Sequence, residues 1–125
     1  MNGHTGLVTI ASGNNQTAIT PTSVTTQTVT QTSLEKIKKN ITKFNRNAVE
    51  IIKNSSIYEY NLKSEKNTDK KHIGFVIGEK YNTPNEVISN DGQGIDAYSQ
   101  RSITWKAVQE IIEVLEREGI MKWEK

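Results

Sequence analysis

The sequence changes character sharply at Ser33. No Asp, Glu, Lys or Arg occurs before Glu35, and every charged residue of the chain lies from that position onward. Residues 1–32 are rich in Thr, Gln, Asn and Gly, and they offer few large apolar side chains for burial. A self-sufficient core therefore has to come mostly from residues 34–125. We expect two parts, an uncharged Thr-rich segment over residues 1–32 and a small charged domain over residues 33–125.

Composition excludes several classes of protein. With 125 residues, the chain holds one ordinary domain or a small domain with an appendage. Its net charge of +2 is too small to indicate nucleic acid or an acidic membrane as the main partner. The absence of cysteine excludes a disulfide framework and thiolate metal sites. There is no signal peptide and no apolar run long enough to span a bilayer, so we expect a soluble protein.

The Thr-rich first part leaves two interpretations open. Leu7, Val8 and Ile10 form a short β-like run, and the Gly-Asn-Asn sequence over residues 13–15 is typical of a turn. Residues 24–31 consist of Val, Thr and Gln, which favours extended backbone. One interpretation is a flexible polar linker, and the other is a set of strands that become buried between chains, as in a fibrous trimer.

The apolar spacing predicts a helix over residues 33–54. Apolar residues recur there at intervals of three and four, and the charged residues lie largely off this stripe. The stripe consists of Leu34, Ile37, Ile41, Phe44, Ala48 and Ile52. Thr32 and Glu35 fit a capping box at the start of the helix.

Two strands and a turn are predicted next. Residues 57–63 alternate between apolar and polar side chains, as in a half-buried strand. Residues 72–77 are nearly continuously apolar, which predicts a strand buried on both faces. Residues 87–88 form a third short strand at most. The Asp-Gly-Gln-Gly sequence over residues 91–94 predicts a tight turn.

A final helix is expected from about Ser102 to Glu118, with Gly119 as the residue that ends it. Its apolar stripe comprises Trp105, Val108, Ile111, Ile112 and Leu115, with spacings that suit a coiled-coil seam. Its acidic residues predict a solvated face, made up of Glu110, Glu113, Glu116 and Glu118. The expected fold class is α+β, a small antiparallel sheet with an N-terminal helix and a C-terminal coiled-coil-like helix.

Most familiar sites are missing. No Gly-rich loop runs into a Lys-Ser/Thr pair, and Gly92-x-Gly94 neither follows a convincing strand nor opens a helix. His4 and His72 have no helical partner histidine, so we expect no metal site. We also expect no cofactor.

Ser33 and Lys38 are the pair with catalytic potential. A serine hydroxyl becomes a nucleophile when a base takes its proton, and a lysine can be that base if its amine is neutral. Desolvation beside apolar side chains favours the neutral amine, and Leu34, Ile37 and Ile41 are available for this. Positions five apart in one ideal helix point about 140° away from each other. The side chains can therefore meet only if Ser33 lies in an incoming strand and Lys38 in the helix, or if a neighbouring chain contributes one partner. Otherwise they are a helix N-terminal serine and a surface lysine.

Four short motifs follow one another in a distinctive order. They are Ser33…Lys38-x-x-Ile41, Ile-Tyr-Glu-Tyr-Asn-Leu over 57–62, Lys-His-Ile-Gly-Phe-Val-Ile-Gly-Glu over 71–79, and Ile-Asp-Ala-Tyr-Ser over 95–99. This order, over residues 33–125, resembles the peptidase S74 family, the C-terminal intramolecular chaperone domains of bacteriophage tailspike, neck appendage and tail fibre proteins. The His-Ile-Gly-Phe and Asp-x-Tyr-Ser elements carry most of the resemblance.

The resemblance implies a function for each part of the chain. Residues 33–125 would be a homotrimeric domain that registers three chains while an upstream β-helical stalk of the same polypeptide folds. The domain would then release itself by autoproteolysis. Residues 1–32 would be the end of a stalk that resembles a triple β-helix. The chain would be a precursor of a virion tail or appendage, made in the host cytoplasm, with no nucleic-acid or membrane partner.

The resemblance also implies the site. In the family the cut falls immediately after the serine of a Ser-Asp-x-Arg-x-Lys motif. The serine maps to Ser33 as nucleophile and the lysine to Lys38 as general base, so that the cleavage site is the Ser33–Leu34 bond. His72 and Glu79 are candidate site-shaping residues.

Two departures from the family motif keep other functions open. Leu34 stands in place of the Asp, and Lys36 in place of the Arg, which keeps the charge but loses the planar fork. The second hypothesis is a non-cleaving trimerisation cap that is retained as a structural part of the phage fibre. A third is an unrelated, monomeric α+β binding module with a disordered Thr-rich leader.

Overall fold

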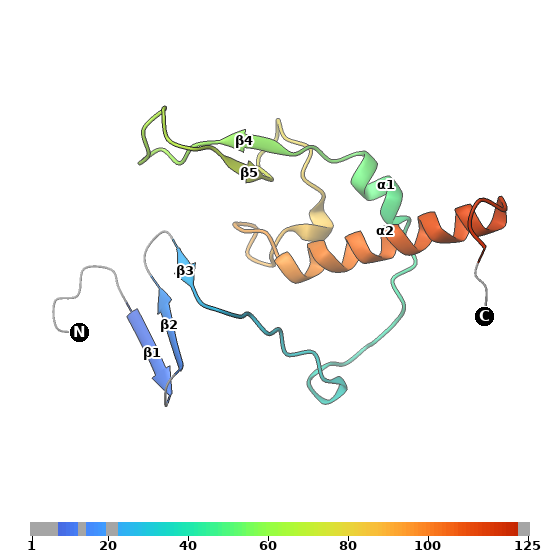
Figure 1. Cartoon of the computed structure of the whole chain (residues 1–125), viewed down its shortest axis with the longest axis horizontal. Helices are drawn as coiled ribbons and strands as arrows, with labels where there is room; N and C mark the ends of the chain where they lie inside the picture. Colours follow the sequence, from blue (N-terminus) through green and yellow to red (C-terminus); the bar gives the residue numbers. More distant parts are fainter. Residues whose placement is uncertain (1–7, 13–14, 20–22, 123–125) are drawn as a thin grey trace. The chain divides into compact units, whose positions relative to one another are not determined.

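The computed structural model describes residues 8–12, 15–19 and 23–122 (Figure 1). The chain divides into two compact units, Met1–Ile41 and Thr42–Lys125. The mixed α+β class predicted from the sequence is confirmed by a two-stranded antiparallel sheet and a long C-terminal helix. A trimer and a β-helical stalk stay predictions.

The first unit contains three short antiparallel strands. They are β1 (Val8–Ser12), β2 (Asn15–Ile19) and β3 (Val24–Thr25), paired in the order β1-β2-β3. The extended backbone expected at Val8, Ile10 and Val24 is therefore present. Leu7 and the first two residues of the expected 13–15 turn lie outside the described residues.

The predicted helix over residues 33–54 is wrong for most of its length. Only two short pieces are helical, the 3-10 turn η1 (Glu35–Ile37) and the α-helix α1 (Ala48–Lys53). The expected capping box is also wrong, because Leu34 is the N-cap residue of η1 and no side chain caps that turn. Between the two pieces, Asn40 has a left-handed backbone with a φ of 55°.

Asparagine explains where the helical pieces begin and end. Asn tolerates left-handed backbone better than other residues with a Cβ atom, and at an N-cap its side chain accepts a backbone N–H bond. Asn40 takes the first role. Asn47 takes the second, because its side chain accepts a hydrogen bond from the Glu50 N–H at 3.1 Å. An apolar stripe without a packing partner does not hold a helix against such breaks.

The two-stranded sheet of the second unit pairs β4 (Tyr58–Tyr60) with β5 (His72–Gly74). Both predicted strands are confirmed but are shorter than expected. The prediction that the second is buried on both faces is wrong, because the Ile73 side chain is 72% exposed. Within the described residues this sheet consists of β4 and β5 alone, so Ile73 lies on a strand with a single neighbour and its side chain is open to solvent.

The C-terminal helix α2 (Ala97–Arg117) begins five residues before the predicted start at Ser102. Asp96 sets this start, because its carboxylate accepts hydrogen bonds from the N–H groups of Tyr98 and Ser99, both at 3.1 Å. These bonds, with that of Ser99 the strongest, hold the pKa of the Asp96 carboxyl below its usual value.

The core of the second unit is small. Among the described residues, the buried apolar side chains are those of Ala48, Val87, Ile103 and Ala107. They join α1 and η2 (Asn85–Val87) to α2, and Figure 1 shows α1 against the middle of α2 with η2 nearer its start. The two alanines let the helix backbones approach closely. The predicted third strand at 87–88 is replaced by η2 and a single bridge between Ile88 and Ile95.

Part of the predicted apolar stripe of α2 faces away from the core of this chain. Ile103 and Ala107 face the core, whereas Trp105 is 73% exposed and Val108 49% exposed. These positions lie on opposite sides of the helix, given 100° per residue. Helix α2 therefore carries two apolar faces, and one of them is uncovered.

The two predicted glycine turns are confirmed. Gly92 has a φ of 76°, and the Ser89 N–H donates to the Gly94 carbonyl at 2.8 Å across the 91–94 turn. Gly119 has a φ of 74° at the end of α2, where the Gly119 N–H bonds the Glu116 carbonyl and the Ile120 N–H bonds that of Leu115. This pair of bonds is the Schellman motif.

Gly119→Ala tests this helix end. Alanine pays roughly 1–2 kcal/mol in left-handed backbone, so we expect the free energy of unfolding to fall by about 1 kcal/mol in urea denaturation. Gly94→Ala is the matched control, because its backbone is not left-handed and a Cβ atom there would meet Ser89 Oγ at an ordinary 3.7 Å. Equal losses in the two variants would contradict the assignment of the motif.

Candidate functional site

Ser33 and Lys38 meet within one chain. Lys38 Nζ donates a hydrogen bond to Ser33 Oγ at 2.5 Å, and both side chains belong to the first unit. The contact is possible because the segment is not a helix. Leu34 and Lys38, on either side of η1, have extended backbone, with ψ angles of 144° and 155°.

A single turn brings the two residues together. The Ile37 N–H donates to the Leu34 carbonyl at 3.2 Å, and the Lys38 N–H donates to the Glu35 carbonyl at 2.9 Å. Because Leu34 and Lys38 are extended, the separation of about 140° in an ideal helix does not apply to the two side chains, and they meet across the turn. From the sequence we expected the two side chains to meet either across a strand followed by a helix or between two chains. In the structure they meet within one chain, across a 3-10 turn.

Apolar side chains surround the pair in sequence but remain uncovered in the single chain. Leu34 is 57% exposed, Ile37 58% and Ile41 63%. Ser33 and Lys38 are also exposed. The apolar residues that the chemistry requires are therefore near the pair in sequence, and a further surface is needed to exclude water from the amine.

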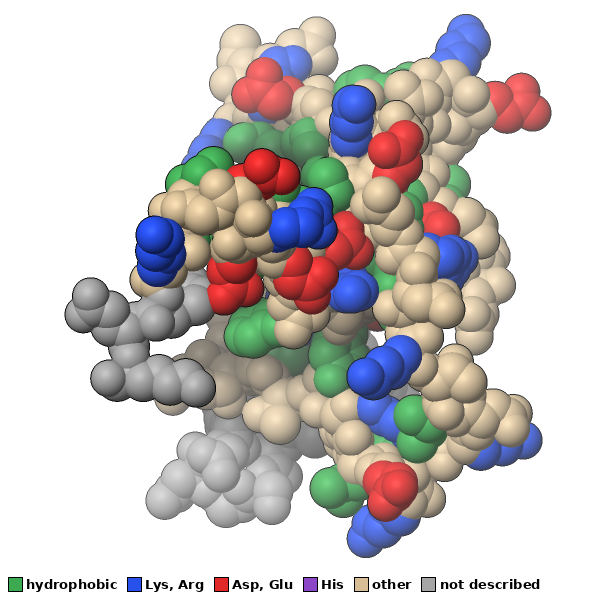
Figure 2. All heavy atoms as spheres, turned by 90° about the vertical axis from the view of Figure 1, so that its right-hand side faces the viewer, with side chains coloured by type: hydrophobic (Ala, Val, Ile, Leu, Met, Phe, Trp, Pro, Cys, Tyr) green, Lys and Arg blue, Asp and Glu red, His purple; other side chains and the backbone are tan. Residues whose placement is uncertain are grey.

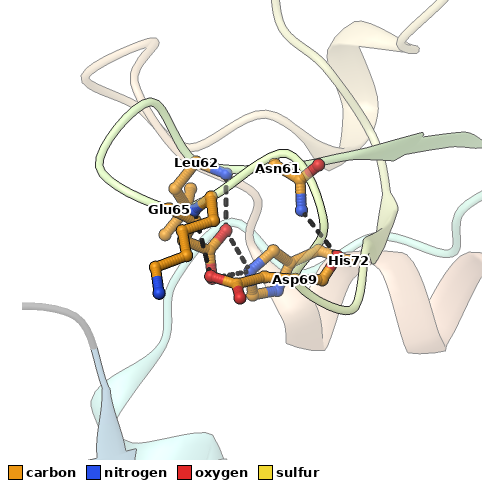
Figure 3. A network of polar contacts seen from close by, with 6 residues as sticks. Asn61, Leu62, Glu65, Asp69 and His72 are labelled. Carbon is orange, nitrogen blue, oxygen red and sulfur yellow. Dashed lines mark hydrogen bonds and ion pairs between the residues drawn. The ribbon is translucent and has the colours of Figure 1, made fainter.

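His72 takes part in a polar network at the β4–β5 hairpin (Figure 3). Its Nε2 lies 3.0 Å from both carboxylate oxygens of Glu65, and its ring stacks on that of Tyr60 at 5.5 Å between centroids. Glu65 Oε1 also accepts the Leu62 N–H at 2.6 Å. The Leu62 N–H, followed by the His72 ring, holds the pKa of the Glu65 carboxyl below its usual value.

The same loop is tied at a second point. Asp69 Oδ2 accepts the Lys66 N–H at 3.0 Å, and the Asn61 side chain donates to the Asp69 carbonyl at 3.2 Å. The described contacts of His72 thus organise the hairpin loop. Glu79 lies in the turn at residues 78–81, where its side chain is exposed. Both candidate site-shaping residues lie in the second unit, and their role stays a prediction.

Glu110 makes a contact that sequence reasoning missed. Its Oε2 accepts the Ala48 N–H and its Oε1 the Val49 N–H, both at 3.0 Å, so that one carboxylate of α2 binds the first turn of α1. These two bonds, with a smaller attraction from Lys106, hold the pKa of the Glu110 carboxyl below its usual value. The interpretation of Glu110 as part of a solvated face is therefore wrong.

A signal for this contact exists in the sequence. Asn47 stands three residues before Glu50, a capping pattern that marks a helix start at position 48. The first N–H groups of any helix need acceptors. The Asn47 side chain supplies the acceptor for the Glu50 N–H. Glu110 supplies the acceptors for the N–H groups of Ala48 and Val49.

The surface formed by the described residues carries charges of both signs. Figure 2 shows acidic and basic side chains interspersed on the face drawn there, with hydrophobic side chains visible between them. Within the described residues, no group of three or more His, Asp or Glu side chains is arranged to hold a metal ion. In the same part of the chain, no helix is long and apolar enough to cross a membrane.

Comparison with known families gives one finding. Residues 34–79 match the family model of peptidase S74, described as chaperone of endosialidase. The resemblance seen in the sequence is thereby confirmed for this segment of the chain. The match includes Lys38, His72 and Glu79, and it begins one residue after Ser33. Comparisons with curated proteins and with solved structures gave no match.

Glu110→Gln tests the tie between α2 and α1. The amide keeps one acceptor oxygen and loses the charge beside the N–H groups of α1, so we expect a melting temperature lower by a few degrees at pH 7. A carboxyl with a lowered folded pKa stabilises the fold above its unfolded pKa, and this contribution is lost as the pH falls through the folded pKa. The difference between wild type and Glu110→Gln should therefore shrink below pH 4.5, the ordinary pKa of the group.

Thermal unfolding followed by circular dichroism at several pH values measures this. Glu113→Gln is the control, because it removes the same charge from the next turn of α2. If the two variants lose the same stability at every pH, Glu110 has no special role.

Proposed function

We propose that this chain, whose residues 34–79 match the peptidase S74 family, is an intramolecular chaperone for an upstream β-helical phage tail or appendage protein. It trimerises and registers three chains while the stalk folds. It then releases itself by cutting the bond between Ser33 and Leu34. The hydrogen bond between Lys38 Nζ and Ser33 Oγ is the observation that carries the catalytic part.

The chemistry assigns one role to each residue of the pair. Neutral Lys38 Nζ takes the proton of Ser33 Oγ. The oxygen then attacks the scissile carbonyl carbon. The resulting ammonium then donates a proton to the leaving Leu34 nitrogen. Neutral amine is favoured where water is excluded. The exposed Leu34, Ile37 and Ile41 can exclude it once a second surface covers them.

Uncovered apolar surface supports assembly into a trimer. In the second unit, a shallow apolar groove runs along α2 past Trp105, Val108 and Ile112. Ile73 of β5 is also uncovered. Such exposed apolar faces are typical of surfaces that become buried between chains. The small core of the single chain makes this burial the more necessary.

Trimerisation gives the domain its chaperone action. Three stalk segments held on one domain meet at high effective concentration, which reduces the entropy cost of long-range β pairing. Removal of the domain after folding makes the assembled stalk hard to reverse, since the registering device is gone. The uncharged, Thr-rich residues 1–32 fit the end of such a stalk.

A non-cleaving trimerisation cap is the second candidate. Leu34 and Lys36 replace the Asp and Arg of the family motif, and this departure at the scissile bond favours it. The cap shares the trimer with the first proposal and differs in leaving the chain whole.

Autoproteolysis is tested by intact mass of the purified protein over time. We expect a fragment that begins at Leu34, absent from Ser33→Ala and formed at least about 100-fold more slowly by Lys38→Ala, the usual scale for loss of a general base. Lys39→Ala is the control and should cleave like wild type. A chain that stays whole in wild type, in a folded trimer, would establish the non-cleaving cap instead.

Light scattering tests the trimer. Val108→Asp places a charge on the uncovered face of α2, and we expect monomers at concentrations where wild type is trimeric. Val108→Leu keeps that face apolar and should remain trimeric. A monomeric wild type would contradict both proposed functions, and a trimeric Val108→Asp would move the interface away from α2.

A further inference from the structure

Ser33 has two roles in the proposed cleavage that conflict within one chain. Its Oγ is the nucleophile, and its own carbonyl carbon is the target, because the scissile bond joins Ser33 to Leu34. Attack on that carbon from the same residue closes a four-membered ring of Oγ, Cβ, Cα and the carbonyl carbon. Angle strain grows roughly as the square of the deviation, and such a ring is far from tetrahedral geometry. The hydroxyl also cannot reach a near-attack alignment with its own carbonyl.

The neighbouring carbonyl within the chain does not resolve the conflict. Ser33 Oγ can reach the carbonyl of Thr32 through a less strained five-membered ring. That attack breaks the bond before Ser33, and the released fragment would begin at Ser33. It cannot produce a cut between Ser33 and Leu34.

The complete pair nevertheless forms inside one chain. Lys38 Nζ and Ser33 Oγ of the same copy are hydrogen-bonded, across one turn whose backbone bonds are also local. Nucleophile and base therefore do not need a neighbour to meet. What a single chain cannot do is place its own Ser33–Leu34 bond within reach of the Ser33 hydroxyl.

We infer that the Ser33–Lys38 pair of each copy cuts the Ser33–Leu34 bond of a second copy. This inference rests on the proposed autoproteolysis. The residues that follow the scissile bond, Leu34 and Ile37, are more than half exposed and offer an apolar surface for contact between equivalent segments. In a closed cyclic trimer, head-to-tail contacts give every copy one neighbour to cut and one neighbour that cuts it.

The steps balance with water as the co-reactant. Lys38 Nζ takes the Ser33 proton, and Oγ bonds to the Ser33 carbonyl carbon of the second copy. The C–N bond to Leu34 of that copy breaks, and its nitrogen leaves with the proton from Lys38. An ester now joins the two copies. Water, deprotonated by Lys38, then attacks the ester, restores the serine hydroxyl and leaves a carboxylate on the second copy's residues 1–33.

Mixed assemblies test the inference. Wild-type chain is co-expressed with isotope-labelled or mass-tagged Ser33→Ala chain, and native mass spectrometry verifies that mixed trimers form. Cleavage between copies predicts that the Ser33→Ala chain is cut between positions 33 and 34, with a cut fraction that rises toward completion as wild type is added in excess. A transient species heavier than one chain by residues 1–33 marks the ester.

Lys38→Ala serves as the second labelled substrate, in case the first variant assembles poorly. It should also be cut by wild-type neighbours. A mixture of Ser33→Ala with Lys38→Ala should stay whole, because neither chain holds a complete pair. Cleavage in that mixture would show that nucleophile and base come from different chains, which overturns the assignment of the pair to one copy.

The outcomes separate the inference from the proposed function. If wild-type copies are cut while both variants stay whole in verified mixed trimers, cleavage occurs within each chain and the inference is wrong. A fragment that begins at Ser33 would likewise overturn it in favour of attack on Thr32. If pure wild type is never cut, the proposed autoproteolysis itself fails, and the inference with it.

Discussion

A shortage of buried apolar surface governs this protein. Among the described residues, the core consists of two alanines, a valine and an isoleucine, which join α1 and η2 to α2. Full burial of one large aliphatic side chain contributes roughly 1.5–3 kcal/mol, against a backbone ordering cost of about 1–2 kcal/mol for every residue. A core of this size, even with the half-buried Phe44, Val49, Ile51 and Ile95 packed against it, leaves much of the ordering of the second unit to polar contacts, and contacts between copies are the further source proposed above.

The polar ties share one arrangement. Glu110 binds two N–H groups at the start of α1, Asp96 binds two at the start of α2, and Glu65 binds the hairpin loop and His72. In each case a carboxylate accepts backbone N–H donors that would otherwise depend on water. The lowered pKa values of these carboxyls have the same origin, since the bonds favour the charged form. Local structure is therefore fixed largely by charged acceptors rather than by packing.

The contrast between structure held by local hydrogen bonds and structure held by packing explains which parts of the fold could be predicted from the sequence. Turns set by Gly92 and Gly119 and the pairing of two strands depend on local chemistry, and they were predictable. Periodicity failed at residues 33–54, where Leu34, Ile37 and Ile41 have the spacing of a helix but are more than half exposed. On α2, periodicity picked out Trp105 and Val108, which are exposed in a single copy, and the coiled-coil seam predicted for them stays a prediction. A hydrophobic pattern indicates which side chains are suited to burial. In this protein many of those side chains are exposed in the single chain.

The failure of the helix prediction bears directly on the site. A continuous helix would hold Ser33 and Lys38 about 140° apart, and their hydrogen bond exists because the chain makes one 3-10 turn and stays extended on both sides. The residue types of the pair were readable from the sequence, whereas their geometry depended on the absence of regular structure.

That same exposed geometry suggests why cleavage would wait for assembly. In the single chain Lys38 is exposed, as are Leu34 and Ile41, whereas a lysine serves as a general base where water is excluded from its amine. Covering those side chains with a second copy removes the water and, on the inference made above, delivers the bond to be cut. One contact then supplies both the neutral base and the substrate. A chain that has not yet assembled lacks both, so no separate switch is needed to keep the domain attached until the chains are in register.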